Sequence, residues 1–167
     1  NHYASVYGMN DVTHLGFFDI PMLTSIPNLV YLAPTNNEEL LAMTEYAVHQ
    51  HEHPVAIRVP VGEFTSTGVA DTTDYSLLNK SEVTRHGERI ALLGLGNFYH
   101  LANQVADELA KFGINATVVN PKFASGLDEE LLEDLKANHS VVFTLEDGVV
   151  EGGWGQRVAS FYGPTNM

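Results

Sequence analysis

The 167-residue chain carries 8 Lys and Arg against 21 Asp and Glu, and its net charge of −13 argues against binding to a nucleic-acid backbone. Apolar residues make up 44% of the chain and charged residues 17%, as in ordinary globular α/β proteins that are long enough to bury a core. The absence of cysteine excludes disulfides, thiolate zinc sites and a cysteine nucleophile, and no apolar run approaches the roughly 20 residues of a membrane span.

The start of the chain has neither an initiating Met nor the charged-then-apolar pattern of a signal peptide. We therefore expect the chain to begin within a longer protein. The lack of cysteine suits a reducing compartment, so we expect a cytoplasmic protein that binds neither membranes nor nucleic acids.

Residues 1–62 have the pattern of half of a doubly wound, parallel α/β sheet. The expected elements are a short helix over residues 17–25, a strand over 29–32, a helix from 36 to about 50 and a strand over 55–59. Thr35 or Asn36 is a suitable N-cap for the longer helix, and the first turn of that helix is acidic. Because two strands leave an unpaired edge, we expect upstream strands to complete the sheet.

Residues 63–80 are rich in Thr, Ser, Gly and Asp and are expected to link the first unit to a second one over residues 81–167. The second unit is expected to contain strands over 82–85, 89–93, 114–119 and 140–145, with helices over 98–112, 128–136 and 156–161. Strands that alternate with helices indicate a second α/β sheet domain with a parallel sheet, and residues 82–85 are expected at its edge.

The most informative motif is Thr13-His14-Leu15-Gly16, which is followed by Phe18-Asp19-Ile20. Its lead-in is irregular and contains Gly and Asn, so the imidazole of His14 can be aimed at a ligand. An imidazole that titrates near neutral pH can donate a proton to a substrate oxygen or accept one. The alternative is a histidine that only pins its own loop through the ring nitrogens.

Together with Ile26-Pro27-Asn28, Ala33-Pro34-Thr35 and Glu38-Glu39, this motif resembles the pyrimidine-binding domain of thiamine diphosphate enzymes of the transketolase type. The segment from Leu145 to Gly155 places an acidic residue at a strand end and a Gly-Gly-x-Gly run before a helix, and it resembles the C-terminal domain of the same family. Glycines there let the backbone turn sharply and let the helix end approach the sheet. The resemblance covers nearly the whole chain and points to the deoxyxylulose-phosphate synthase branch of the family.

The resemblance implies a transferase that passes a two-carbon unit to an aldehyde acceptor, as in isoprenoid precursor biosynthesis. It implies that His14 points into the active-site cleft and orients substrate hydroxyls. Thr13 and Asn10 are further candidate substrate contacts, although their residue types favour local hydrogen bonds within a turn. Thiamine diphosphate and Mg²⁺ are expected to be bound by segments outside this chain. The expected partners are a small-molecule substrate, a second copy in a homodimer and the N-terminal part of the same enzyme.

Two arginines that hold the substrate phosphate in the deoxyxylulose-phosphate synthase branch have no counterpart here. Tyr3 stands about where the first would be, and Val61 stands where the second would be. Neither side chain can make a bidentate contact to a phosphate, so the specificity for a phosphorylated substrate is open. Asn10 also replaces an aspartate of that branch. Arg58 is either a substrate contact or one partner of an ion pair.

Two further patterns have simpler structural explanations. His49-x-His51-x-His53 could clasp a transition metal, but it precedes Pro54 at a helix end, where histidines suit the helix dipole. Gly94-Leu95-Gly96 lies between a strand and a helix like a nucleotide-binding turn. Tyr99 stands where the third glycine would be, which favours a plain tight turn.

Three functions remain open from the sequence. The first is the thiamine diphosphate-dependent transferase described above. The second is a transketolase or the beta subunit of a 2-oxoacid dehydrogenase, because these proteins share the same pair of folds. The third is a non-catalytic dimerisation module that kept the scaffold, which the missing arginines favour.

Overall fold

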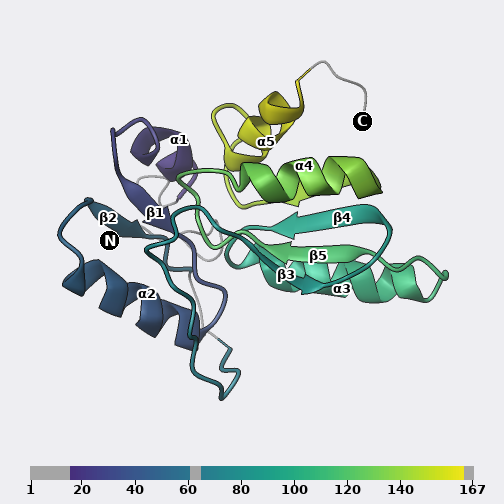
Figure 1. Ribbon diagram of the computed structural model, residues 1–167, viewed down its shortest axis with the longest axis horizontal. Helices are drawn as coiled ribbons and strands as arrows, with labels where there is room; N and C mark the ends of the chain where they lie inside the picture. The colour runs from purple at the N-terminus through teal and green to yellow at the C-terminus, as the bar shows by residue number, and fades with distance from the viewer. Residues whose placement is uncertain (1–15, 61–64, 164–167) are drawn as a thin grey trace.

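The computed structural model describes residues 16–60 and 65–163, which form two sheets flanked by helices (Figure 1). The first unit contains α1 (Asp19–Leu23), β1 (Val30–Leu32), α2 (Asn37–His49) and β2 (Val55–Ile57). The second contains β3 (Glu82–Arg85), β4 (Arg89–Gly94), α3 (Phe98–Ala110), β5 (Thr117–Asn120), α4 (Glu129–Asn138), β6 (His139–Leu145) and α5 (Trp154–Tyr162). The α/β class predicted from the sequence is confirmed.

The first sheet consists of β1 and β2, which run parallel with Val30 opposite Val55. All three residues of β1 are buried, as expected for a compact apolar run. The helix α2 connects the two strands and begins after Asn36, whose side-chain oxygen accepts a hydrogen bond from the backbone N–H of Glu39 at 2.8 Å. This N-cap satisfies one of the free N–H groups of the first turn, and the acidic residues there suit the helix dipole.

The second sheet has the strand order β3-β5-β4-β6. The strand β4 is parallel to β5 and β6, and β3 is antiparallel to β5 at one edge. Helices α4 and α5 cover one side of this sheet and α3 covers the other (Figure 1). Neighbouring residues of β4 face opposite sides, because Leu93 belongs to the core under α4 and α5 whereas Leu92 packs with Ala102 and Ala106 of α3. The parallel arrangement and the edge position of residues 82–85 confirm the sequence predictions.

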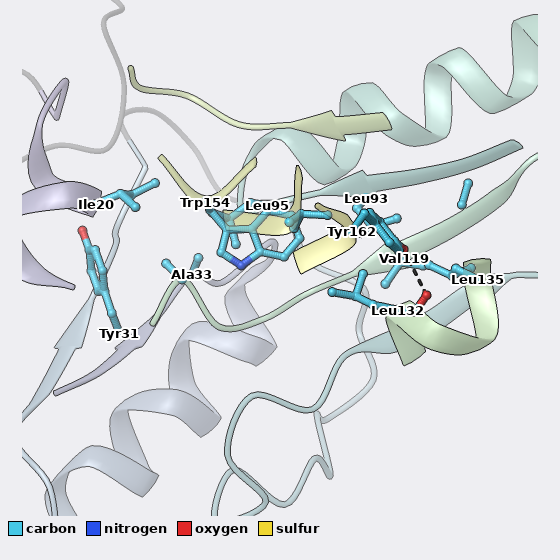
Figure 2. Close-up of a cluster of buried hydrophobic side chains, with 13 residues drawn as sticks. Ile20, Tyr31, Ala33, Leu93, Leu95, Val119, Leu132, Leu135, Trp154 and Tyr162 are labelled. Atoms are coloured by element: carbon cyan, nitrogen blue, oxygen red, sulfur yellow. Dashed lines mark hydrogen bonds between the residues drawn. The ribbon is translucent and has the colours of Figure 1, made fainter. Parts of the chain in front are cut away.

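The two sheets share a hydrophobic core (Figure 2). Its buried members are Ile20, Tyr31, Ala33, Ala91, Leu93, Leu95, Val119, Ala124, Leu132, Leu135, Trp154, Val158 and Tyr162. The indole N–H of Trp154 donates to the carbonyl of Gly126 at 3.1 Å, which satisfies the one polar group of this side chain. An isolated antiparallel bridge between Leu32 and Phe123 joins β1 to the segment after β5. The two units are therefore packed directly against each other.

The segment that connects the two sheets packs against the first unit. Tyr75 is only 2% exposed and lies between Tyr46 of α2 and Phe123, with its ring centroid 6.1 Å from each of theirs. Its hydroxyl donates to the carboxylate of Asp71. The described part of the expected linker is thus fixed by buried contacts. Among the described residues, no helix combines the length and apolar character that crossing a bilayer requires.

Candidate functional site

The motif around His14 lies at the limit of the described structure. The site positions that fall outside the described residues are Tyr3, Asn10, Thr13, His14 and Val61. Gly16, two residues after His14, is described and buried, and its carbonyl contacts Arg58, the fourth predicted site residue. The site can therefore be built outward from Arg58.

Arg58 forms a buried ion pair with Asp19. It follows β2 directly, and Asp19 is the first residue of α1. Nε of Arg58 donates to Oδ2 of Asp19 at 2.6 Å, and Nη2 donates to Oδ1 at 3.3 Å. Tyr31 of β1 donates its hydroxyl to the same carboxylate at 2.5 Å. Arg58 and Asp19 are 3% and 8% exposed, so the ion-pair interpretation of Arg58 is confirmed.

The same guanidinium also binds two backbone carbonyls. Nη2 of Arg58 donates to the carbonyl of Gly16 at 3.2 Å and to the carbonyl of Asp147 at 2.6 Å. Gly16 belongs to the His14 motif, whereas Asp147 belongs to the turn that follows β6. One buried side chain thus joins α1, Gly16 and the turn after β6 in the C-terminal unit.

The environment fixes the protonation states in this cluster. Burial alone would lower the pKa of Arg58, but the hydrogen bond and the charge of Asp19 more than offset it, and the pKa is raised. Burial and the hydrogen bond to Asp19 raise the pKa of the Tyr31 hydroxyl. Burial also raises the pKa of the Asp147 carboxyl, although the charge of Arg58 opposes this shift. Arg58 therefore stays charged at neutral pH and Tyr31 stays a neutral donor.

The acidic, glycine-rich segment after β6 forms a tight turn into α5. Oε2 of Glu146 accepts a hydrogen bond from the backbone N–H of Gly155 at 2.7 Å, so a carboxylate of the chain itself occupies the start of this helix. A Cβ on Gly153 would lie 2.2 Å from Oε1 of Glu146 and 2.4 Å from the carbonyl oxygen of Val149, so glycine is required there. Burial raises the pKa of Glu146, and the N–H of Gly155 opposes the shift. The start of α5 is therefore not an open phosphate site.

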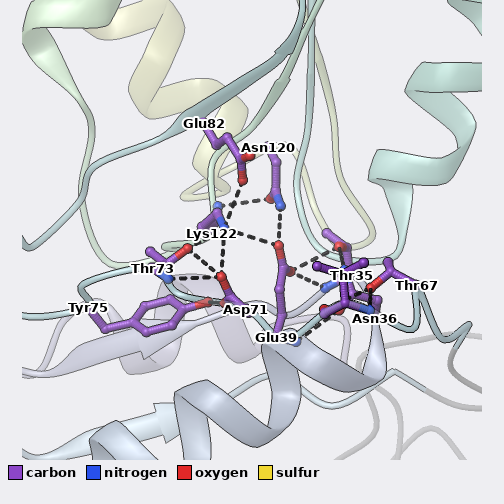
Figure 3. A network of polar contacts seen from close by, with 11 residues as sticks. Thr35, Asn36, Glu39, Thr67, Asp71, Thr73, Tyr75, Glu82, Asn120 and Lys122 are labelled. Atoms are coloured by element: carbon purple, nitrogen blue, oxygen red, sulfur yellow. Dashed lines mark hydrogen bonds and ion pairs between the residues drawn. The ribbon is translucent and has the colours of Figure 1, made fainter.

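A second buried polar cluster, which we call the Lys122 cluster, joins α2, the connecting segment and the second sheet (Figure 3). Its members are Thr35, Glu39, Asp71, Thr73, Tyr75, Glu82, Asn120 and Lys122. Nζ of Lys122 lies 2.9 Å from a carboxylate oxygen of Glu82, 3.3 Å from one of Glu39 and 3.9 Å from one of Asp71. Glu39 also accepts from the N–H and hydroxyl of Thr35 and from the amide of Asn120. The sequence indicated only that Glu39 suits the first turn of α2, and it did not predict the contacts with Asn120 and Lys122.

Two sequence patterns remain, namely the histidine series before Pro54 and the segment Gly94-Leu95-Gly96, and local contacts account for both. Nδ1 of His49, the last residue of α2, lies 2.9 Å from the carbonyl of Glu45. Within residues 16–60 and 65–163, no group of three or more His, Asp or Glu side chains is arranged to hold a metal ion. A Cβ on Gly94 would lie 2.6 Å from Cα of Tyr99, so this glycine permits the tight strand-to-helix turn expected from the sequence.

Known proteins resemble this chain over most of its length. The family model described as the transketolase C-terminal domain matches residues 79–166. The 1-deoxy-D-xylulose-5-phosphate synthase of Acaryochloris marina is 38% identical over 156 residues, which cover 93% of this chain and 25% of that protein. The 1-deoxy-D-xylulose-5-phosphate synthase of Desulforudis audaxviator is 39% identical over 157 residues, which cover 93% of this chain and 24% of that protein.

A solved structure described as a split gene transketolase in an inactive beta4 tetramer matches with a TM-score of 0.75 and 26% identity. The match covers 90% of this chain and 49% of that one. The chain spans about a quarter of the length of the curated relatives that it matches. It belongs to the transketolase C-terminal domain family, and the resemblance inferred from the sequence is confirmed.

Proposed function

From this family membership we propose that the chain is the C-terminal part of a thiamine diphosphate-dependent transferase similar to 1-deoxy-D-xylulose-5-phosphate synthase. The observation that carries the proposal is the 38% identity that extends over 93% of the chain and so includes both units. In this proposal, residues 1–62 belong to the pyrimidine-binding domain, residues 81–167 form the C-terminal domain and residues 63–80 connect them. The enzyme would pass a two-carbon unit to an aldehyde acceptor.

We assign the catalytic role in this chain to His14. Its imidazole would orient substrate hydroxyls and move protons, for which a group that titrates near neutral pH is suited. Thr13 and Asn10 are the proposed substrate contacts. The burial of Arg58 and its pairing with Asp19 favour an indirect role for that side chain.

The cofactor and its metal ion would be bound outside this chain. Thiamine diphosphate, when bound, supplies the thiazolium ring that stabilises the donor carbanion. One observation favours binding of its diphosphate elsewhere, because Glu146 occupies the start of α5.

The identity of the acceptor is a separate part of the proposal. The relatives are named for a phosphorylated product, whereas Tyr3 and Val61 stand where arginines would hold a phosphate. The same departure favours a second candidate function, a non-catalytic assembly module of the same fold. The matched split gene transketolase is described as an inactive beta4 tetramer, which supports this second candidate.

We further propose a cytoplasmic homodimer that acts on a small molecule. Phe112 is 79% exposed and Leu101 of α3 is 40% exposed, so apolar surface is available for a contact between two copies. Light scattering should give the mass of a dimer. A stable monomer mass at high micromolar concentration would contradict the assembly without bearing on the chemistry.

The proposed reaction can be tested with the longer protein that contains this chain, purified and supplied with thiamine diphosphate and Mg²⁺. A five-carbon 1-deoxy ketose phosphate combines a two-carbon methyl ketone unit, as pyruvate supplies by decarboxylation, with a three-carbon aldehyde phosphate. We expect mass spectrometry to detect 1-deoxy-D-xylulose 5-phosphate only when thiamine diphosphate is present. If a product forms only from unphosphorylated glyceraldehyde, the acceptor is the free aldehyde and not its phosphate. If no product forms although the cofactor is bound, the result favours the non-catalytic assembly module.

A further inference from the structure

We propose that Arg58 is a positioning residue that ties the His14 motif to the turn after β6 in the C-terminal unit. The inference rests on the proposed function, because it assigns a task to a side chain that does not itself touch the substrate. It gives the C-terminal unit a part in shaping the active site in addition to any part in dimer formation.

The first observation is where the donors of Arg58 point. Its Nε and Nη2 bind both carboxylate oxygens of Asp19, and Nη2 also donates to the carbonyls of Gly16 and Asp147. The side chain is 2% exposed, so these donors are turned into the protein. A side chain in this position acts on the substrate through the segments that it holds.

The second observation is that the anchor of Arg58 is itself fixed. The carboxylate of Asp19 accepts the Tyr31 hydroxyl at 2.5 Å, and Tyr31 lies on the buried strand β1. The carbonyl held by this anchor belongs to Gly16, two residues from His14. Gly16 is the described residue of the Thr13-His14-Leu15-Gly16 motif, and its carbonyl is fixed by this anchor.

The third observation is the close approach of the C-terminal turn to the start of α1. A Cβ on Gly148 would lie 3.6 Å from the carbonyl oxygen of Phe17, and a Cβ on Gly152 would lie 2.7 Å from Cβ of Pro21. The turn therefore rests on the segment that follows His14. The buried hydrogen bond from Arg58 to the carbonyl of Asp147 adds a further contact that holds the turn in this place.

Lysine at position 58 would not reproduce the arrangement. The guanidinium uses two nitrogens in a planar fork to reach Asp19, while one of them also reaches two carbonyls. An ammonium group concentrates its donors on one nitrogen and cannot hold the same set of acceptors at once. Arg58→Lys therefore keeps the buried charge and loosens the tie, which makes it a more informative variant than Arg58→Met.

The test uses the longer protein with thiamine diphosphate and Mg²⁺. Arg58→Lys should lower kcat on the order of 10²-fold, because a small misplacement of a catalytic group costs about that much, and it should leave the thiamine diphosphate Kd within about twofold. Hydrogen exchange should become faster in peptides that cover residues 16–23 and 146–152. The matched control is Arg85→Lys, because Arg85 pairs with Asp107 on the surface at 2.6 Å. This control should change neither kcat nor the hydrogen exchange of these peptides.

Asp19→Asn is the second variant, because it removes the charge while keeping an acceptor for Tyr31. It should shift kcat and exchange in the same direction as Arg58→Lys. Folded Arg58→Lys protein with wild-type kcat, or with unchanged exchange at both peptides, would overturn the proposal. If the wild-type protein forms no product, the proposed function fails, and the exchange measurement still decides whether Arg58 ties the two segments.

Discussion

Replacing Lys122 with methionine should destabilise the protein, because the Lys122 cluster would lose a buried cation. Lys122→Met removes the cation that lies within 4 Å of carboxylate oxygens of Glu39, Asp71 and Glu82, while the methionine keeps much of the buried volume. The Lys122 side chain is 3% exposed. Removing one partner of a buried ion pair costs about 3–5 kcal/mol, because a charge is left buried without compensation.

The remaining contacts place the expected loss at the lower end of that range. Glu39 keeps its hydrogen bonds from Thr35 and Asn120, and Asp71 keeps those from Thr73 and Tyr75. The Glu82 side chain is 55% exposed and can turn to water. We expect a loss of about 3 kcal/mol in the free energy of unfolding. With a urea m-value of about 2 kcal/mol/M, the midpoint of unfolding should fall by about 1.5 M.

The dependence of this loss on pH follows from the pKa shifts. Burial would lower the pKa of Lys122, but the charge of Glu39 and the contact with Glu82 raise it. The contribution of Lys122 to folding stability is therefore complete below pH 10.5, and it is lost as the pH rises through the folded pKa. Burial would raise the pKa of Asp71, but hydrogen bonds from Thr73 and Tyr75 lower it. The contribution of Asp71 to folding stability is therefore complete above pH 3.8, and it is lost as the pH falls through the folded pKa. The effect of Lys122→Met should be largest between about pH 4 and pH 10.

Lys111→Met is the matched control, because Lys111 pairs with Glu108 on the surface and both side chains are about two-thirds exposed. Such a pair contributes at most about 1 kcal/mol. If Lys122→Met and Lys111→Met shifted the urea midpoint equally, the cluster would not hold the two units together as argued.

Three further predictions concern the acceptor, an exposed carboxylate and the cofactor. Val61→Arg in the longer protein should lower the KM for a phosphorylated acceptor, and an unchanged KM would show that the phosphate is held elsewhere. Hydrogen bonds from Ser66 and Thr67 lower the pKa of Glu38 to about 2, so Glu38 supports the fold above pH 4.5 and loses this effect as the pH falls toward 2. An NMR titration of Glu38 should show this pKa, and a value near 4.5 would contradict the geometry. Calorimetric titration of the 167-residue chain should show no tight thiamine diphosphate binding, and micromolar binding would place the cofactor site within it.

Much of the fold follows from local sequence signals. Asn36 and Asp128 were suited to start helices, and both side chains accept hydrogen bonds from the first turn. Element ends were less predictable. The helix expected over 98–112 ends at Ala110, and the strand expected from 114 begins at Thr117. After Ala110 the backbone N–H groups of Phe112 and Gly113 donate to carbonyls three residues back, so the last turn is tighter than an α-helix, and Phe112 is 79% exposed.

The polar clusters were less accessible to sequence reasoning. Arg58 and Asp19 are 39 residues apart and Glu39 and Asn120 are 81 apart, so no spacing rule connects them. Packing within the first unit brings Asp19 of α1 to Arg58, and packing of the two sheets on one core brings Glu39 of α2 to Asn120 of β5. The position of Glu146 before the glycines was easier to interpret from the sequence than these distant pairs. Its contact with the start of α5 is local, since Glu146 and Gly155 are nine residues apart.

The central proposal is that His14 is the catalytic histidine of a transketolase-type active site, and His14→Ala in the longer protein tests it most directly. Steady-state turnover should fall on the order of 10²-fold or more, while the thermal midpoint and the thiamine diphosphate Kd stay close to those of the wild type. His49→Ala, at the exposed end of α2, should leave turnover nearly unchanged. Full turnover in folded His14→Ala, or loss of the fold without a separate loss of rate, would contradict the account.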